Sequence, residues 1–114
     1  MHISFFIRQK FVFDLLGHLI IWVLTFWGAC IFVTEYGTVD ASGGGGVDQG
    51  STQEWYNFLD SKKISNLNWA ISNKAEGAAA LTPGTTSSQV GNDDRLTTSG
   101  RIVKNYIKSK NTGF

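Results

Sequence analysis

The hydrophobic pattern divides this chain of 114 residues into two unlike parts. Residues 11–33 are almost continuously apolar, and Asp14 and His18 are the interruptions. Beyond residue 37, apolar positions recur periodically among polar and small residues. A long apolar run is typical of a buried or membrane-associated helix, whereas periodic patterns predict the packed elements of a globular domain. We therefore divide the chain into an apolar leader (1–30), a domain segment (31–110) and a short tail (111–114).

The leader admits three interpretations, and the sequence leaves them open. A basic start, an apolar run and the small residues at 28–30 are typical of a secretory signal. The length of the run at 11–33 also suits a membrane anchor. In the third interpretation, residues 1–30 do not belong to the functional protein. For the fold, we expect an apolar N-terminal helix here.

Residues 31–71 carry the pattern of a strand, a helix and a second strand. The strand at 31–37 is apolar and has Glu35 near its end. Ser51 predicts a helix N-cap, after which Trp55 faces the core and Tyr56 the surface. The alternation at 64–71 predicts a strand whose apolar side chains share one face, namely Leu67, Trp69 and Ile71. A βαβ unit with parallel strands, and hence an α/β fold, follows.

The remaining segments predict loops and one more helix. The glycines at 43–46 precede no Gly-Lys-Ser/Thr motif, so we interpret them as a plain surface loop rather than a phosphate cradle. Residues 72–96 are polar and small, which predicts a long irregular excursion of the kind that often carries function. The apolar spacing after residue 96 predicts a C-terminal helix with Thr98 or Ser99 as its N-cap.

Charge and cysteine content exclude several functions. Ten basic and nine acidic side chains leave a formal charge of +1, which gives no support for nucleic-acid binding. The single cysteine, Cys30, cannot form an internal disulfide. His2 and His18 have no partners at metal-ligand spacing. We therefore expect neither a metal nor a cofactor.

Several motifs occur in an order that resembles a known enzyme family. They are Ile-Phe-Val-Thr-Glu-Tyr-Gly-Thr at 31–38, Asp-Ala-Ser-Gly at 40–43, Asn-Trp at 68–69, and Lys-Ala-Glu at 74–76 followed by Ala-Ala-Leu-Thr-Pro-Gly at 79–84. Over residues 31–110 the chain resembles the C-terminal part of a glycoside hydrolase family 5 cellulase. It is most similar to secreted endoglucanases of bacteria and plant-parasitic nematodes.

The resemblance implies the last two βα units of a (β/α)₈ TIM barrel and retaining hydrolysis of β-1,4-glucosidic bonds in cellulose or related β-glucans. It implies that Glu35 is the nucleophile and that Trp69 stacks on a glucose ring. Lys74 and Glu76 would contact sugar hydroxyls, and the backbone at Ala41 would touch the sugar. The partner would be a polysaccharide. Secretion is the expected localisation, with membrane anchoring through residues 11–33 as the alternative.

The sequence also departs from the family pattern. A retaining glycosidase needs a second carboxyl group as general acid and base. In the family this is the glutamate of an Asn-Glu-Pro motif, which does not occur in these 114 residues. We therefore expect a C-terminal fragment with little or no activity by itself. The alternative is a non-catalytic remnant, membrane-anchored or secreted, that binds glucan weakly through Trp69.

Overall fold

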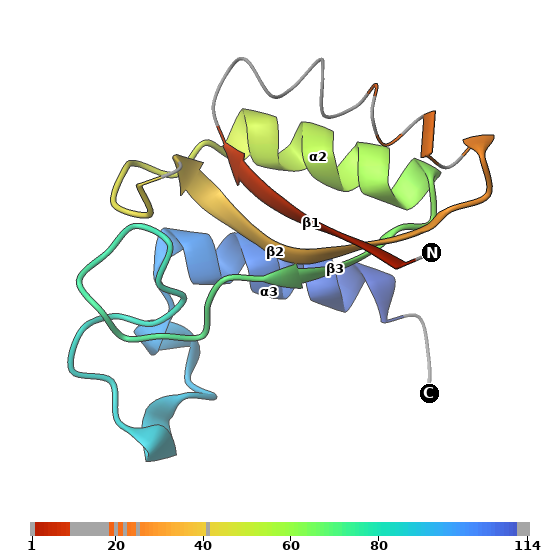
Figure 1. Ribbon diagram of the computed structural model, residues 1–114. Coiled ribbons are helices and arrows are strands. Elements are labelled where there is room, and N and C mark those ends of the chain that lie inside the picture. The colour runs from red at the N-terminus through yellow and green to blue at the C-terminus, as the bar shows by residue number, and fades with distance from the viewer. Residues whose placement is uncertain are drawn as a thin grey trace.

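The computed structural model describes residues 2–9, 19, 21, 23–24, 26–40 and 42–111. Within these ranges, β1 (His2–Gln9), β2 (Cys30–Asp40) and β3 (Ser65–Asn68) form one sheet in that order. Both strand pairs are parallel. Helix α2 (Gln49–Ser61) connects β2 to β3, and α3 (Thr98–Lys110) follows the long connection after β3 (Figure 1). The predicted α/β fold with parallel strands is confirmed.

The first residues of the leader form a strand, His2–Gln9, and not part of the predicted apolar helix; residues 10–18, where the apolar run of the leader begins, lie outside the described residues. The strand contains β-branched and aromatic residues that favour extended backbone, and its pairing with β2 satisfies backbone donors and acceptors. Helical backbone occurs further on, at Leu19, Ile21, Val23, Leu24 and Phe26. Across the described residues, no helix combines the length and apolar character that crossing a membrane requires.

The helix starts also differ from the sequence interpretation. Helix α2 is capped by Asp48, whose carboxylate accepts a hydrogen bond from the Ser51 amide at 3.0 Å, so Ser51 is not the N-cap. Helix α3 is capped by Thr97, whose hydroxyl accepts from the Gly100 amide at 3.0 Å. Each of these caps satisfies an amide that the helix itself leaves without a partner.

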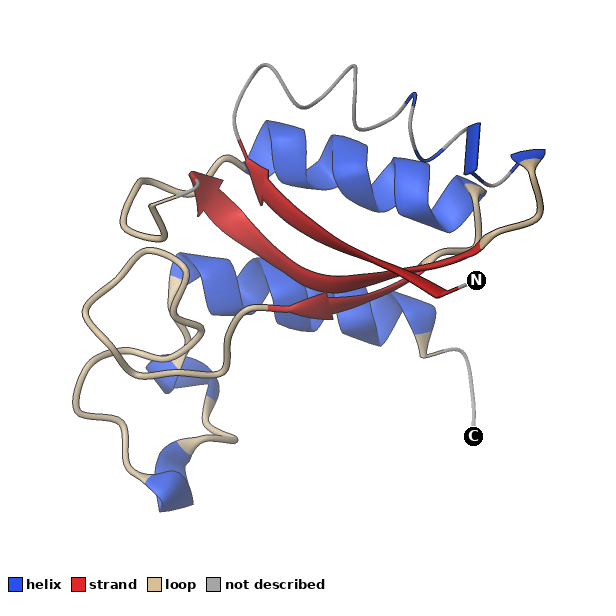
Figure 2. Cartoon of the chain, viewed as in Figure 1, coloured by secondary structure: helices blue, strands red, loops and turns tan. Residues whose placement is uncertain are grey.

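The connection from β3 to α3 is irregular, as predicted. Short 3₁₀ turns at Ser87–Gln89 and Asp93–Arg95 interrupt it (Figure 2). It lies at the same end of the molecule as the glycine-rich loop that follows β2. Two loops far apart in sequence are therefore neighbours.

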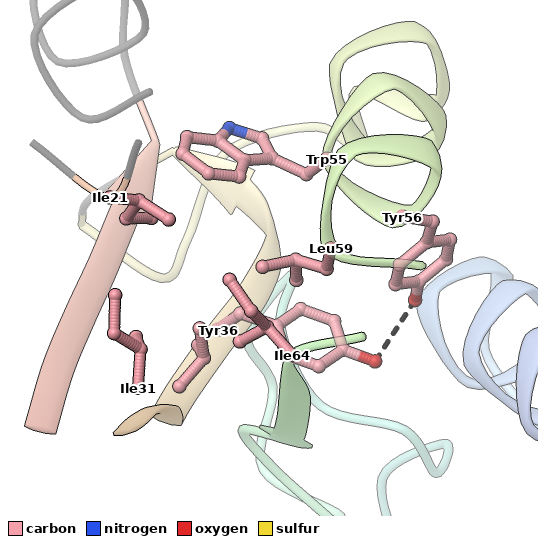
Figure 3. Packing of buried hydrophobic residues seen from close by; sticks show 8 residues of the cluster. Ile21, Ile31, Tyr36, Trp55, Tyr56, Leu59 and Ile64 are labelled. Carbon is pink, nitrogen blue, oxygen red and sulfur yellow. Dashed lines mark hydrogen bonds between the residues drawn. The ribbon is translucent and has the colours of Figure 1, made fainter. Parts of the chain in front are cut away.

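The core lies between the sheet and the helices. Trp55 and Leu59 of α2 belong to one buried cluster with Ile31 of β2 and with Ile64, which directly precedes β3 (Figure 3). The predicted core position of Trp55 is confirmed, and half-buried Ile102 of α3 packs on the same cluster. Burial of these side chains is the main source of stability, at roughly 25 cal/mol per Å² of apolar surface.

A chain of tyrosines crosses this core and corrects a second prediction. Tyr56, expected at the surface, is only 2% exposed. Its hydroxyl is 3.0 Å from that of Tyr36, and the two rings meet edge to face (Figure 3). On its other side, Tyr56 stacks on Tyr106 with ring centroids 3.6 Å apart. The Tyr106 hydroxyl donates to Asp60 at 2.9 Å, so the network ties β2 to both helices.

Because of this network, we expect the protein to lose stability at alkaline pH. Burial raises the pKa of Tyr36, and burial together with the hydrogen bond to Tyr36 raises the pKa of Tyr56. An unfolded tyrosine ionises near pH 10, below the folded-state values. The stabilisation is therefore fully present below about pH 10 and is lost as the pH rises above it. We expect the urea concentration at the midpoint of unfolding to decrease when the pH is raised from about 9 to about 11. The double variant Y36F/Y56F should show a shallower decline, and an equally steep one would contradict the assignment.

Candidate functional site

The central strand β2 contains a β-bulge at Thr34 and Glu35. On the β1 side, Val33 and Glu35 are opposite consecutive residues, so Thr34 is an extra residue. On the β3 side, Val33 pairs with Asn66 and Tyr36 pairs with Asn68. An advance of three residues along β2 therefore matches an advance of two residues along β3. Both neighbouring strands therefore register the same insertion. A bulge re-aims side chains and is common next to active sites.

The bulge decides which face of the sheet carries Glu35. Ile31 and Val33 are buried against the helices, and strict alternation would place Glu35 with them. Beyond the bulge, the alternating buried positions are Tyr36 and Thr38, and Val39 after them is buried as well. Glu35 is therefore on the face opposite the core, where its side chain is half-buried.

The pairing of β3 shows which of its residues face the helices. Asn66 pairs with Val33, and Asn68 pairs with Tyr36. The Asn66 amide reaches the Tyr106 hydroxyl of α3 at 3.4 Å. Asparagines thus occupy the helix-covered side of this strand.

Leu67 and Trp69 consequently lie on the same face of the sheet as Glu35. Leu67 is 56% exposed and Trp69 is 54% exposed, so neither belongs to the core. The predicted alternation is confirmed across β3, which is shorter than the strand predicted at 64–71, and it directs Leu67 away from the helices. The arrangement combines a carboxylate with a half-exposed indole on one open sheet face. Such a pair can present a nucleophile or base beside a flat apolar platform.

The backbone of Tyr36 holds Trp69 in place. Its carbonyl accepts from the Trp69 amide at 2.8 Å and from the Asn68 side-chain amide at 3.3 Å. The peptide bond from Trp69 to Ala70 is cis. Because Tyr36 directly follows Glu35, the carboxylate and the indole are fixed by one short piece of backbone.

Lys74 and Glu76 lie near the tip of a loop that closes on itself. The amides of Ala80 and Leu81 donate to the carbonyls of Ala70 and Ser72 at 3.1 and 3.0 Å. Lys74 is exposed and Glu76 is half-buried. We call residues 70–81 the Lys74 loop. The structure places it at the carboxyl end of β3, while Ala41, the remaining predicted site residue, lies outside the described residues.

Helix α3 supports the base of the Lys74 loop. The Thr97 hydroxyl donates to the Ala79 carbonyl at 2.6 Å, and Gly100 approaches the Ala80 carbonyl so closely that a Cβ there would be 2.1 Å from the oxygen. Thr38 of β2 donates to the Ser99 hydroxyl at 2.7 Å, and both residues are buried. The end of β2, the start of α3 and the loop base therefore form one unit.

Sequence reasoning missed the residues that orient the site. Thr34, which creates the bulge, and Asn68, whose side-chain amide bonds the Tyr36 carbonyl, both lie within the motifs of the family resemblance, but the sequence analysis assigned neither a role. The bulge shows only in the burial pattern of the folded chain, where the buried positions change spacing from two residues, between Ile31 and Val33, to three residues, between Val33 and Tyr36. The sequence does not reveal this spacing, because Phe32 is apolar as well. In the described part of the chain, no group of three or more His, Cys, Asp or Glu side chains is arranged to hold a metal ion.

Comparison with known proteins identifies the sequences that this chain resembles. Residues 22–75 match the family model described as cellulase, glycosyl hydrolase family 5. The chain is 48% identical over 85 residues to an endoglucanase of Clostridium saccharobutylicum and 43% identical over 82 residues to endoglucanase N of Pectobacterium atrosepticum. These alignments cover 75% and 72% of this chain but only 19% and 18% of the relatives.

Solved structures show the same relation. A protein from Cytophaga hutchinsonii superposes on 96% of this chain with a TM-score of 0.73 and 36% identity, and the match spans 35% of that protein. The catalytic domain of an endoglucanase from Thermobifida fusca superposes with a TM-score of 0.76 at 21% identity, over 94% of this chain and 34% of that domain. The second match shows the fold alone.

The buried hydroxyl pair that joins β2 to α3 is testable by a double-mutant cycle. T38V or S99A should each lower the free energy of unfolding by about 1–3 kcal/mol, because each leaves a buried hydroxyl without its partner. The double variant T38V/S99A should lose clearly less than the sum of the two. Urea unfolding followed by circular dichroism measures all four proteins, and strictly additive losses would show that the two hydroxyls are not coupled.

Proposed function

Because this chain carries part of a cellulase domain of glycosyl hydrolase family 5, we propose that it forms the nucleophile side of a site for retaining hydrolysis of β-1,4-linked glucan. One observation carries the proposal. The bulge in β2 and the pairing of β3 bring Glu35 and Trp69 to the same open face of a parallel sheet. The matched proteins named endoglucanase and cellulase support the substrate class.

The roles of the residues follow from the chemistry of a sugar. A glucose ring offers a flat C–H face and a rim of hydroxyls, so Trp69 stacks on the face while Lys74 and Glu76 bond the rim. The backbone at Ala41 contributes a further contact. Glu35 attacks the anomeric carbon and forms the glycosyl-enzyme, which water then hydrolyses.

The reaction needs a second carboxyl group about 5–5.5 Å from the nucleophile to act as acid and base. We assign Glu76 to binding, and the Asn-Glu-Pro motif is absent from residues 1–114. The general acid and base therefore comes from residues outside this sequence, and the 114 residues alone hydrolyse little or no glucan.

The open face supports the same proposal. Parallel sheets are normally covered on both faces, yet Leu67 of β3 is 56% exposed. The other strands of a (β/α)₈ barrel would cover this face. Because cellulose is an extracellular polymer, we also propose that the protein is secreted.

The nucleophile can be tested without the missing acid. In 2,4-dinitrophenyl 2-deoxy-2-fluoro-β-cellobioside, the bond to the dinitrophenolate breaks without protonation while the Glu35 carboxylate bonds to the anomeric carbon. Mass spectrometry should find the fluorocellobiosyl group on the peptide that contains Glu35. The label should disappear in E35Q and persist in E54Q, which removes an exposed carboxylate of α2.

Hydrolysis of carboxymethylcellulose by the purified 114-residue chain should stay at background. Clear turnover that E35Q abolishes would contradict the proposal that the acid and base lies outside this sequence. Labelling of another carboxylate in place of Glu35 would contradict the assigned nucleophile.

Trp69 should dominate binding of a short glucan. Calorimetric titration with cellotetraose, which is bound in a solved complex of the Thermobifida fusca endoglucanase, should show affinity falling roughly tenfold or more in W69A. The matched control W27F changes another exposed tryptophan and should bind as the unaltered chain does. Equal losses in the two variants would rule out a specific stacking role for Trp69.

A further inference from the structure

The glycine-rich loop after β2 is in contact with the Lys74 loop. We call residues 42–46 the glycine loop. The Ala78 amide donates to the Gly43 carbonyl at 3.0 Å. Beside this bond, Gly77 approaches Gly45 so closely that a Cβ on Gly77 would be 2.1 Å from the Gly45 carbonyl oxygen. The two loops therefore meet backbone to backbone, and the contact is next to Glu76.

The glycine loop lies at the surface, as its composition predicts, and Asp40 holds it to the end of β2. The Asp40 carboxylate accepts from the Ser42 amide at 2.9 Å, and the Asp40 carbonyl accepts from the Gly43 amide at 3.0 Å. The Gly44 amide donates to the Ser42 hydroxyl at 3.2 Å. A loop tied in this way can act as a fixed support.

The position of Gly77 indicates that the glycine loop supports the tip of the Lys74 loop rather than its base. The contacts with α3 hold Ala79 and Ala80 at the base of the Lys74 loop. Gly77 is instead adjacent to Glu76 and three residues after Lys74. The Val39 side chain is also close, with its Cγ1 3.1 Å from the Cβ site of Gly77. A side chain at residue 77 would have to push the loop tip away from both Gly45 and β2.

We propose that Gly77 is a positioning residue for substrate binding, which rests on the proposed function. Its missing side chain lets the Lys74 loop seat against the glycine loop, and this seating sets where Lys74 and Glu76 meet the sugar. The glycine loop thereby connects the end of the nucleophile-bearing strand to the sugar-binding loop. Gly77 itself does not touch the substrate.

The test compares two glycine substitutions in the full 114-residue chain. G77A introduces the backbone clash, whereas G46A adds a Cβ that meets nothing within 4 Å. Titration with cellotetraose should show roughly tenfold weaker binding for G77A and an unchanged affinity for G46A. The discriminating step repeats G77A in a K74A/E76Q background, where it should have no further effect because the side chains that it positions are gone.

A second variant avoids any clash. D40A removes the carboxylate that holds the glycine loop, and it should weaken cellotetraose binding only when Lys74 and Glu76 are present. Unchanged affinity in G77A and D40A, or the same loss in the K74A/E76Q background, would overturn the positioning role. Failure of the unaltered chain to bind cellotetraose would instead overturn the proposed function itself.

Discussion

The β-bulge at Thr34 and Glu35 is the constraint on which the rest of this structure depends. Without the extra residue, Glu35 would follow Ile31 and Val33 onto the helix-covered face. An ionised carboxylate buried there without a partner would cost several kcal/mol or more. The bulge instead places Glu35 on the open face and returns Tyr36 to the core. Because both neighbouring strands pair around it, the whole sheet maintains this geometry.

Tyr36, which follows the bulge, connects the open face of the sheet to the hydrophobic core. Its carbonyl holds the backbone of Trp69, and its hydroxyl meets Tyr56 inside the core. Tyr56 in turn stacks on Tyr106 of α3. The open face and the packed face of the sheet are thus joined through one residue, and the hydrophobic core that stabilises the fold also positions the site.

A second support acts at the loop end of the sheet. Thr38 bonds the start of α3, which holds the base of the Lys74 loop, and Asp40 holds the glycine loop. Both residues belong to the last part of β2. The strand that carries the carboxylate therefore also anchors, directly or through α3, the loop that carries Lys74 and Glu76. Displacement of this strand would move the nucleophile and the sugar-binding loop together.

The sequence by itself determined the elements whose signals are local. The periodicities of 31–71 predict strand, helix and strand, and the motifs around Glu35 and Trp69 identify the family, because both depend on near neighbours in the chain. Tertiary structure alone decided the strand at His2–Gln9, the burial of Tyr56 and the support that the glycine loop provides. Each of these depends on a pairing or contact between segments far apart in sequence, which no local pattern encodes. The face of the sheet that Glu35 occupies was also decided by tertiary structure, because a one-residue shift in strand pairing reverses which side of the sheet a side chain faces.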